Sequence, residues 1–195
     1  MQQITNKVLG IFLNRKIIDE DMTDVYRYGL EILFSSLCTT FSILIISCLL
    51  GSLELGILYL FLTIPLKLTA GGYHADTYKK CFLISNFTFA VLICVYKIIS
   101  QYSIPITAWL IVLYYSAFYI FIKAPVQNIH QPLSTVKVER NKRQARLYLL
   151  LDCCVITFLA IAIPTSEYMP FAILCILLVA LYIIPTQKKG GTHNE

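Results

Sequence analysis

Charged residues are scarce in this sequence. Only 14% of its 195 residues are Asp, Glu, Lys or Arg, whereas 57% are hydrophobic, and about 25% of a soluble domain is charged. This shortage excludes a water-soluble globular domain, because the chain lacks the polar side chains to cover its surface in water. The mean hydropathy of +0.71 agrees with that exclusion. We therefore expect an integral membrane protein.

Apolar stretches take up most of the chain. A helix needs about 20 apolar residues to cross the roughly 30 Å hydrocarbon core of a bilayer. Six stretches near that length predict an all-α, polytopic membrane helix bundle: 30–50, 53–66, 82–99, 104–122, 147–163 and 168–184. The second is the weakest because it is short and contains Pro65, although protein or a water-lined cavity can satisfy a loosened backbone.

The first 29 residues lack the apolar core and the small-residue cleavage site of a signal peptide. Apolar residues recur there at helical spacing: Ile4, Val8, Ile11 and Phe12. This pattern predicts an amphipathic segment that anchors the chain in the inner membrane interface. We expect residues 1–29 to form a cytoplasmic or interfacial region of one membrane domain, 1–195.

Positive charge is missing from every second turn between the expected spans. With the N-terminus inside, all Lys and Arg residues except Lys97 fall on the inner side, as the positive-inside rule requires. Lys97 lies near an outer span end, where its stem can snorkel to the headgroups. We expect both termini in the cytoplasm of a bacterial cell. The net charge of +5 favours anionic lipid or an acidic peptide as a partner over nucleic acid.

No CxxC metal or redox motif occurs among the seven cysteines. Six of them fall inside expected spans, where cysteine behaves as a small hydrophobe. Cys81 differs because it lies at the membrane boundary directly after Lys79 and Lys80. Nearby cations favour the thiolate form, which is the nucleophile. Cys81 is therefore the cysteine best placed to react.

The segment between the second and third spans carries the candidate chemistry. Gly71 and Gly72 free the backbone, and His74, Asp76 and Cys81 follow within ten residues. A cysteine nucleophile needs a base, and the base needs an orienting group, roles that fit His74, Cys81 and, as the orienter, Asp76. The alternative is a chance spacing of polar residues in a boundary loop. A metal site is disfavoured, because zinc takes three or four protein ligands.

The spacing sets a geometric condition on catalysis. On a straight helix, positions 74 and 81 share a face but lie roughly 10 Å apart along the axis. Proton transfer needs a hydrogen-bond distance of about 3 Å. Catalysis within one chain therefore requires the backbone to bend or unwind between the two residues, unless two protomers each supply one of them. We expect a bend, re-aimed by Gly71–Gly72.

These residues resemble the accessory gene regulator B (AgrB) family of bacterial membrane peptidases. The resemblance rests on Ala-Gly-Gly-Tyr-His-Ala at 70–75 with Cys81 seven residues after His74, and the length and the Tyr-Arg-Tyr-Gly-Leu stretch at 26–30 support it. It implies a cysteine endopeptidase that removes the C-terminal tail of a quorum-sensing propeptide. The acyl-enzyme thioester is then displaced by a side chain of the peptide, which closes a thiolactone or lactone. The resemblance also implies a homodimer and no cofactor.

The resemblance assigns roles by position. Cys81 is the nucleophile, His74 the base, and Gly72 permits the local backbone shape. Lys67 stands where many family members have arginine, which matters if that side chain grips a carboxylate bidentately, because lysine offers only a point charge. Backbone N–H groups near Gly71–Gly72 are a candidate oxyanion site.

Two further sets of charged residues attract attention. Glu31, near the inner end of the first span, is expected to pair with Lys67 or, less readily, to position His74. The basic cytoplasmic loop 123–146 contains Arg140, Lys142 and Arg143. Because family propeptides resemble an amphipathic leader with an acidic tail, these three side chains are expected to bind that tail.

A non-enzymatic function remains the alternative. A peptide transporter or a membrane assembly partner would also contain internal carboxylates and a proline-broken second span. Loss of propeptide cleavage after substitution of Cys81 or His74 would distinguish a peptidase from a transporter or an assembly partner.

Overall fold

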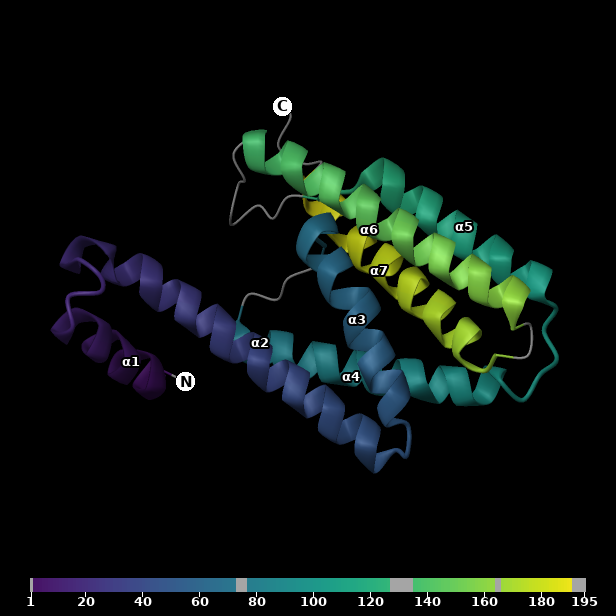
Figure 1. Ribbon diagram of the computed structural model, residues 1–195, viewed down its shortest axis with the longest axis horizontal. Helices are drawn as coiled ribbons and strands as arrows, with labels where there is room; N and C mark the ends of the chain where they lie inside the picture. Colours follow the sequence, from purple (N-terminus) through teal and green to yellow (C-terminus); the bar gives the residue numbers. More distant parts are fainter. Residues whose placement is uncertain (1, 73–76, 127–134, 164–165, 191–195) are drawn as a thin grey trace.

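The computed structural model describes residues 2–72, 77–126, 135–163 and 166–190, and the elements in these ranges are helices joined by short turns (Figure 1). They are α1 (Gln2–Asn14), the 3-10 turn η1 (Glu20–Met22), α2 (Thr23–Leu49), α3 (Leu53–Ala70), α4 (Tyr78–Ile99), α5 (Ile106–Lys123), α6 (Thr135–Ala162) and α7 (Tyr168–Gly190). The predicted all-α class is confirmed.

Each of the six expected apolar stretches lies within a helix, apart from at most two residues at an end. Within the described residues, the five helices α2 to α6 are long and apolar enough to cross a membrane, and the apolar part of α7, Tyr168–Ile184, is shorter. The second stretch, expected to be the weakest, belongs to an 18-residue helix, because α3 continues past Pro65 to Ala70. The Thr69 hydroxyl donates to the Pro65 carbonyl oxygen at 2.9 Å, a bond to the backbone one turn earlier in the same helix.

The segment expected as a basic loop, 123–146, is helical from Thr135 onward. Lys, Arg, Glu and Gln are good helix formers, and outside lipid nothing interrupts the helix that the span begins. With 28 residues, α6 is about 42 Å long. It therefore exceeds the roughly 30 Å hydrocarbon core, and its basic first turns project beyond the apolar part.

Helix α7 forms the centre of the bundle. It packs against α3, α4, α5 and α6, whereas α2 packs mainly on α3 and α4 (Figure 1). The described side chains of α7 are buried on almost every side, among them Phe171, Ile173, Cys175, Ile176 and Val179. Helix α3 joins the two groups of helices, since it contacts α2 as well as α6 and α7.

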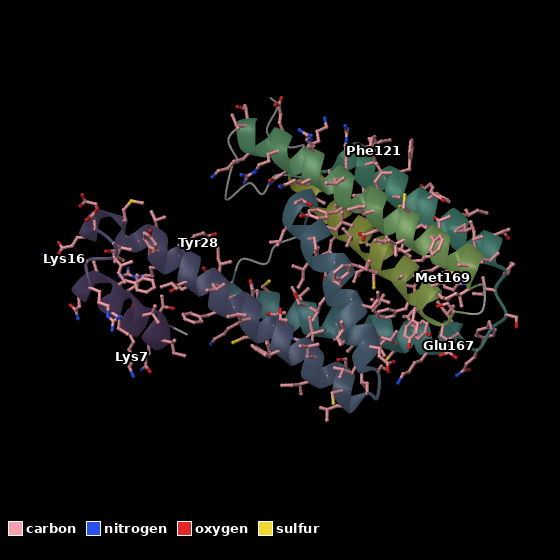
Figure 2. The ribbon with its side chains drawn as sticks, in the orientation of Figure 1. Lys7, Lys16, Tyr28, Phe121, Glu167 and Met169 are labelled. Carbon is pink, nitrogen blue, oxygen red and sulfur yellow. The ribbon has the colours of Figure 1, made fainter. Side chains whose placement is uncertain are left out.

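The alternating helix directions create two ends of the bundle. One end, called here the Cys81 end, holds the C-termini of α3, α5 and α7 and the N-termini of α4 and α6 (Figure 1). Phe121 lies at this end and Glu167 and Met169 lie at the other (Figure 2). Which side of a membrane each end faces stays a prediction.

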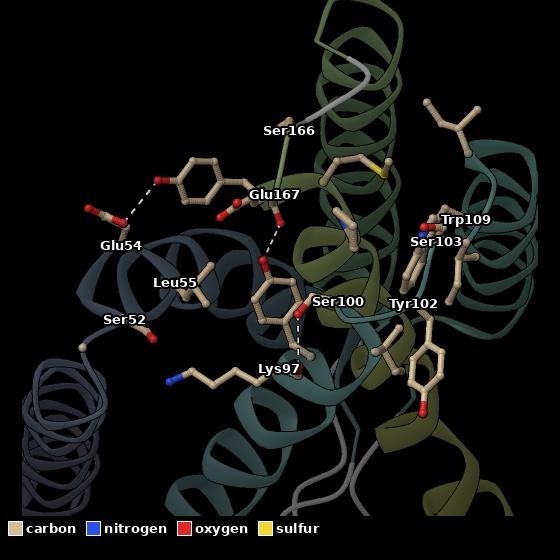
Figure 3. Close-up of a pocket in the computed structure, with 18 residues that line it drawn as sticks. Ser52, Glu54, Leu55, Lys97, Ser100, Tyr102, Ser103, Trp109, Ser166 and Glu167 are labelled. Carbon is tan, nitrogen blue, oxygen red and sulfur yellow. Dashed lines mark hydrogen bonds between the residues drawn. The ribbon is translucent and has the colours of Figure 1, made fainter.

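At the opposite end, the turns between helices surround a cavity of about 880 Å³ (Figure 3). The Tyr96 hydroxyl donates to the Glu167 carbonyl oxygen at 2.8 Å, and the Tyr168 hydroxyl donates to Glu54 Oε2 at 3.2 Å. The Lys97 ammonium donates to the Leu50 carbonyl oxygen at 2.9 Å. Lys97 thus binds the negative C-terminal end of α2, whereas the sequence suggested only contact with headgroups.

The expected amphipathic segment is α1, which folds back on the N-terminal half of α2 (Figure 1). Thr5 and Leu9 are buried, while Ile4 and Ile11 are exposed. Figure 2 shows Lys7 and Lys16 on the outer surface of this hairpin. The exposed apolar side chains of α1 are available for the predicted contact with the membrane interface, which stays a prediction.

Gly56 allows α2 and α3 to pack closely, because a Cβ built there would lie 2.6 Å from Ser47 Cβ. We predict that Gly56→Ala lowers the free energy of unfolding in detergent micelles by about 1–3 kcal/mol, as overpacking does. Gly29→Ala is the matched control, since Gly29 lies in α2 with nothing within 4 Å, and it should be neutral or slightly stabilising. Equal stability of the two variants would contradict the close packing.

Candidate active site

The segment 67–81 contains the last turn of α3, the Gly71–Gly72 pair and the first turn of α4. Two of its expected site residues, His74 and Asp76, lie outside the described residues. The structure therefore places the nucleophile candidate Cys81 and the supporting residues around it.

Cys81 lies in the first turn of α4. Thr77 precedes the helix in an extended conformation (φ −136°, ψ 147°), and its hydroxyl accepts from the Lys80 N–H at 3.3 Å. The Cys81 N–H donates to the Thr77 carbonyl oxygen at 3.0 Å. The positive end of the helix dipole favours an anion at such a position. Because α4 begins at Tyr78, no regular helix runs unbroken back from Cys81 to position 74.

Gly71 ends α3 with a backbone that other residues rarely adopt. Its φ is +72°, and a Cβ added to it would collide with the Val126 carbonyl oxygen. The Val126 N–H donates to the Ala70 carbonyl oxygen at 2.9 Å, so the chain after α5 pairs with the chain after α3. The Gly71 N–H already donates to the Lys67 carbonyl oxygen at 3.0 Å. The suggested oxyanion role is thus wrong for the Gly71 N–H.

Gly72 brings the segment against α7. Its φ is +134°, and a Cβ added to it would lie 3.3 Å from the Tyr182 carbonyl oxygen. Both the backbone conformation and the space therefore favour glycine here.

The Lys67 side chain lies against α7. Its ammonium lies 3.8 Å from the centre of the Tyr182 ring, and it interacts electrostatically with Cys81. In the part of the chain that the structure describes, no carboxylate lies within ion-pair distance of this ammonium. Lys67 therefore presents a single positive charge, held against an aromatic face.

Sequence reasoning missed Tyr182. A tyrosine near the end of an apolar helix is typical of the aromatic belt at a membrane interface, and the sequence offers no signal that its ring meets Lys67. Only the packing of α7 between α3 and α4 brings the two side chains together.

Glu31 does not pair with Lys67, contrary to expectation. Its carboxylate interacts with the hydroxyl of Tyr78, the first residue of α4. The reason is that α2 packs against α4, whereas Lys67 turns to the α7 side of α3. Glu31 therefore lies near the start of the helix that contains Cys81. Its suggested contact with His74 lies outside the described residues.

Arg140, Lys142 and Arg143 lie exposed on the first turns of α6, at the Cys81 end. No hydrogen bond or ion pair joins them to the described residues of segment 67–81. The next basic residue of α6, Arg146, lies over the Phe121 ring, 4.2 Å from its centre. Among the described residues, these three side chains form no ion pair and stay exposed.

Comparison with known proteins identifies a family and a relative of this chain. The family model "Accessory gene regulator B" matches residues 2–184. A putative AgrB-like protein of Clostridium perfringens (strain SM101 / Type A) is 22% identical over 150 residues, which cover 73% of this chain and 69% of that protein. No solved structure matches.

Gly71→Ala tests the turn that precedes the candidate site. We predict a larger loss of thermal stability in micelles than for Gly51→Ala. Both glycines have positive φ, but nothing lies within 4 Å of a Cβ at Gly51. Gly51→Ala should lose about 1–2 kcal/mol through backbone strain alone. The collision with Val126 should add about 1–3 kcal/mol at Gly71, and equal losses would show that the pairing with Val126 is not tight.

Proposed function

Because the chain belongs to the accessory gene regulator B family, a peptidase family of autoinducing-peptide processing, we propose that it is a membrane cysteine endopeptidase that cleaves the C-terminal tail from a quorum-sensing propeptide. Cys81 is the nucleophile and His74 the general base. The observation that carries the proposal is the position of Cys81, in the first turn of a helix and within electrostatic reach of the Lys67 ammonium.

Cleavage starts when His74 takes the Cys81 proton. The Cys81 sulfur attacks the carbonyl carbon of the scissile peptide bond, and the tetrahedral intermediate collapses as the C–N bond breaks. His74 returns the proton to the leaving amine of the tail. The peptide stays bound through a thioester to Cys81. Asp76, if it orients His74, keeps the imidazole in the tautomer that this transfer needs.

Ring closure follows by exchange. A thiol or hydroxyl of the same peptide attacks the thioester carbonyl, its proton passes to His74, and the bond to the Cys81 sulfur breaks. Thioester exchange changes little in bond energy, and the nucleophile on the same chain has a high effective concentration. A water-poor pocket protects the intermediate from hydrolysis. The product is a thiolactone or a lactone.

The described neighbours support the nucleophile. Lys67, at the end of α3, supplies positive potential where negative charge forms on sulfur and on the carbonyl oxygen. The Glu31–Tyr78 contact steadies the first turn of α4. Gly71 and Gly72 allow the chain after α3 to pack against Val126 and against Tyr182 of α7.

The distribution of positive charge supports a cytoplasmic position for this site in a bacterial cell membrane. The exposed basic residues of α6 are suited to the acidic tail of the propeptide, and the hairpin of α1 and α2 is suited to membrane lipid. A homodimer is the expected assembly.

Substitution of the two reactive residues tests the chemistry. Purified Cys81→Ala and His74→Ala should each lose propeptide cleavage, and the wild type should yield an acyl adduct that mass spectrometry maps to Cys81. Cys154→Ala is the control, because Cys154 is exposed on α6. Retained cleavage in Cys81→Ala would reject the peptidase and leave a transporter or an assembly partner.

Charge on α6 tests the tail contact. The triple variant Arg140→Gln, Lys142→Gln, Arg143→Gln should raise the KM for an acidic-tailed propeptide about tenfold at low salt. The difference from wild type should shrink as salt rises, because exposed charges are screened. Lys7→Gln, Arg15→Gln, Lys16→Gln removes the same charge from the exposed α1 region and should not change KM. An equal effect of both triples would argue for general attraction and against a tail site.

A further inference from the structure

Tyr182 meets all three parts of the candidate site. Its ring lies under the Lys67 ammonium of α3, its hydroxyl donates to Thr88 Oγ1 of α4 at 2.9 Å, and its carbonyl oxygen lies against Gly72. We infer that Tyr182 is a positioning residue that fixes the Lys67 ammonium beside the Cys81 thiol. The inference rests on the proposed function and adds the residue that sets its electrostatics.

The Lys67 side chain needs such a partner. A lysine has a flexible four-carbon stem, and near a membrane boundary its ammonium can snorkel toward water. Within the described residues it has no ion-pair partner, and its ammonium lies over the aromatic face of Tyr182. An aromatic face attracts a cation more strongly where water is scarce. The ring thus replaces the hold that a carboxylate would give, without neutralising the charge.

The Tyr182 hydroxyl fixes the ring relative to α4. Thr88 donates its own hydroxyl proton to the Ile84 carbonyl oxygen, so Tyr182 is the donor in the bond to Thr88. Thr88 follows Cys81 by seven residues, which places both on nearly the same face of α4. The two hydrogen bonds, from Tyr182 to Thr88 and from Thr88 to Ile84, therefore fix the Tyr182 ring relative to the face of α4 that contains Cys81.

These contacts connect the two charges of the reaction. Lys67 belongs to α3 and Cys81 to α4, and the helical conformation ends between them at Gly71. From α7, the Tyr182 ring contacts the Lys67 side chain, and the Tyr182 hydroxyl contacts Thr88 on the face of α4 that contains Cys81. A positive charge held in advance stabilises an anion without reorganisation at the moment of reaction. Tyr182 acts through Lys67, because its own hydroxyl donates to Thr88.

The test measures the reactivity of Cys81 itself. The full chain in micelles is treated with iodoacetamide at neutral pH, and mass spectrometry follows alkylation at Cys81. Tyr182→Leu should slow alkylation about tenfold, because it removes the cation–π contact. Tyr182→Phe keeps the ring and loses the hydroxyl, so it should slow alkylation about two- to threefold, as should Thr88→Val. Leu181→Ala, an exposed neighbour on α7, should have no effect.

A double-mutant cycle separates positioning from general destabilisation. In a Lys67→Met background, Tyr182→Leu should cause no further slowing, because the charge that it positions is already gone. Additive losses, or an unchanged rate in Tyr182→Leu alone, would overturn the inference. Retained secondary structure and thermal stability in each variant exclude misfolding as the cause.

Alkylation needs no propeptide, so the inference and the proposed function fail separately. If the wild type cleaves propeptide, and the Tyr182→Leu variant is alkylated and cleaves propeptide at the wild-type rates, only the inferred role of Tyr182 is rejected. If the wild type does not cleave, the peptidase is lost, and the alkylation series still decides whether Tyr182 places a charge beside Cys81.

Discussion

The candidate site depends on the break between α3 and α4. If α3 continued past Ala70 as a helix, Lys67 and Cys81 would lie four turns apart, about 21 Å along one axis. Gly71 and Gly72 end the helix with backbone angles that favour glycine, and Val126 and Tyr182 leave little room for a side chain there. The break lets α4 start in a new direction, and the Lys67 cation of α3 interacts electrostatically with the Cys81 thiol of α4.

Sequence reasoning predicted the features that are set locally. The length of each apolar stretch, compared with bilayer thickness, predicts the helices, and the glycine pair predicts the interruption before Cys81. Length alone did not show how far a helix continues outside the apolar part, so the first turns of α6 were expected as a loop. Arg140 and its neighbours favour helix as strongly as an apolar segment does, but hydropathy does not record that preference.

Contacts between helices could not be predicted in the same way. Helix α7 is apolar on all sides, so its sequence shows no face that would identify its neighbours. Its central position, and with it the meeting of Tyr182 and Lys67, follows only from packing. Glu31 was assigned to Lys67 because opposite charges at the same membrane depth attract. The packing of α2 on α4 gives it a tyrosine hydroxyl as a partner.

The contact of Lys67 with Tyr182 bears on the choice between lysine and arginine. A side chain that grips a carboxylate bidentately must be arginine, since an ammonium cannot supply two parallel donors. A side chain that supplies positive potential over an aromatic face can be either, because both cations bind ring faces. Lys67 has the second kind of contact. A lysine at this position is therefore compatible with the proposed chemistry, provided that the ring beneath it stays in place.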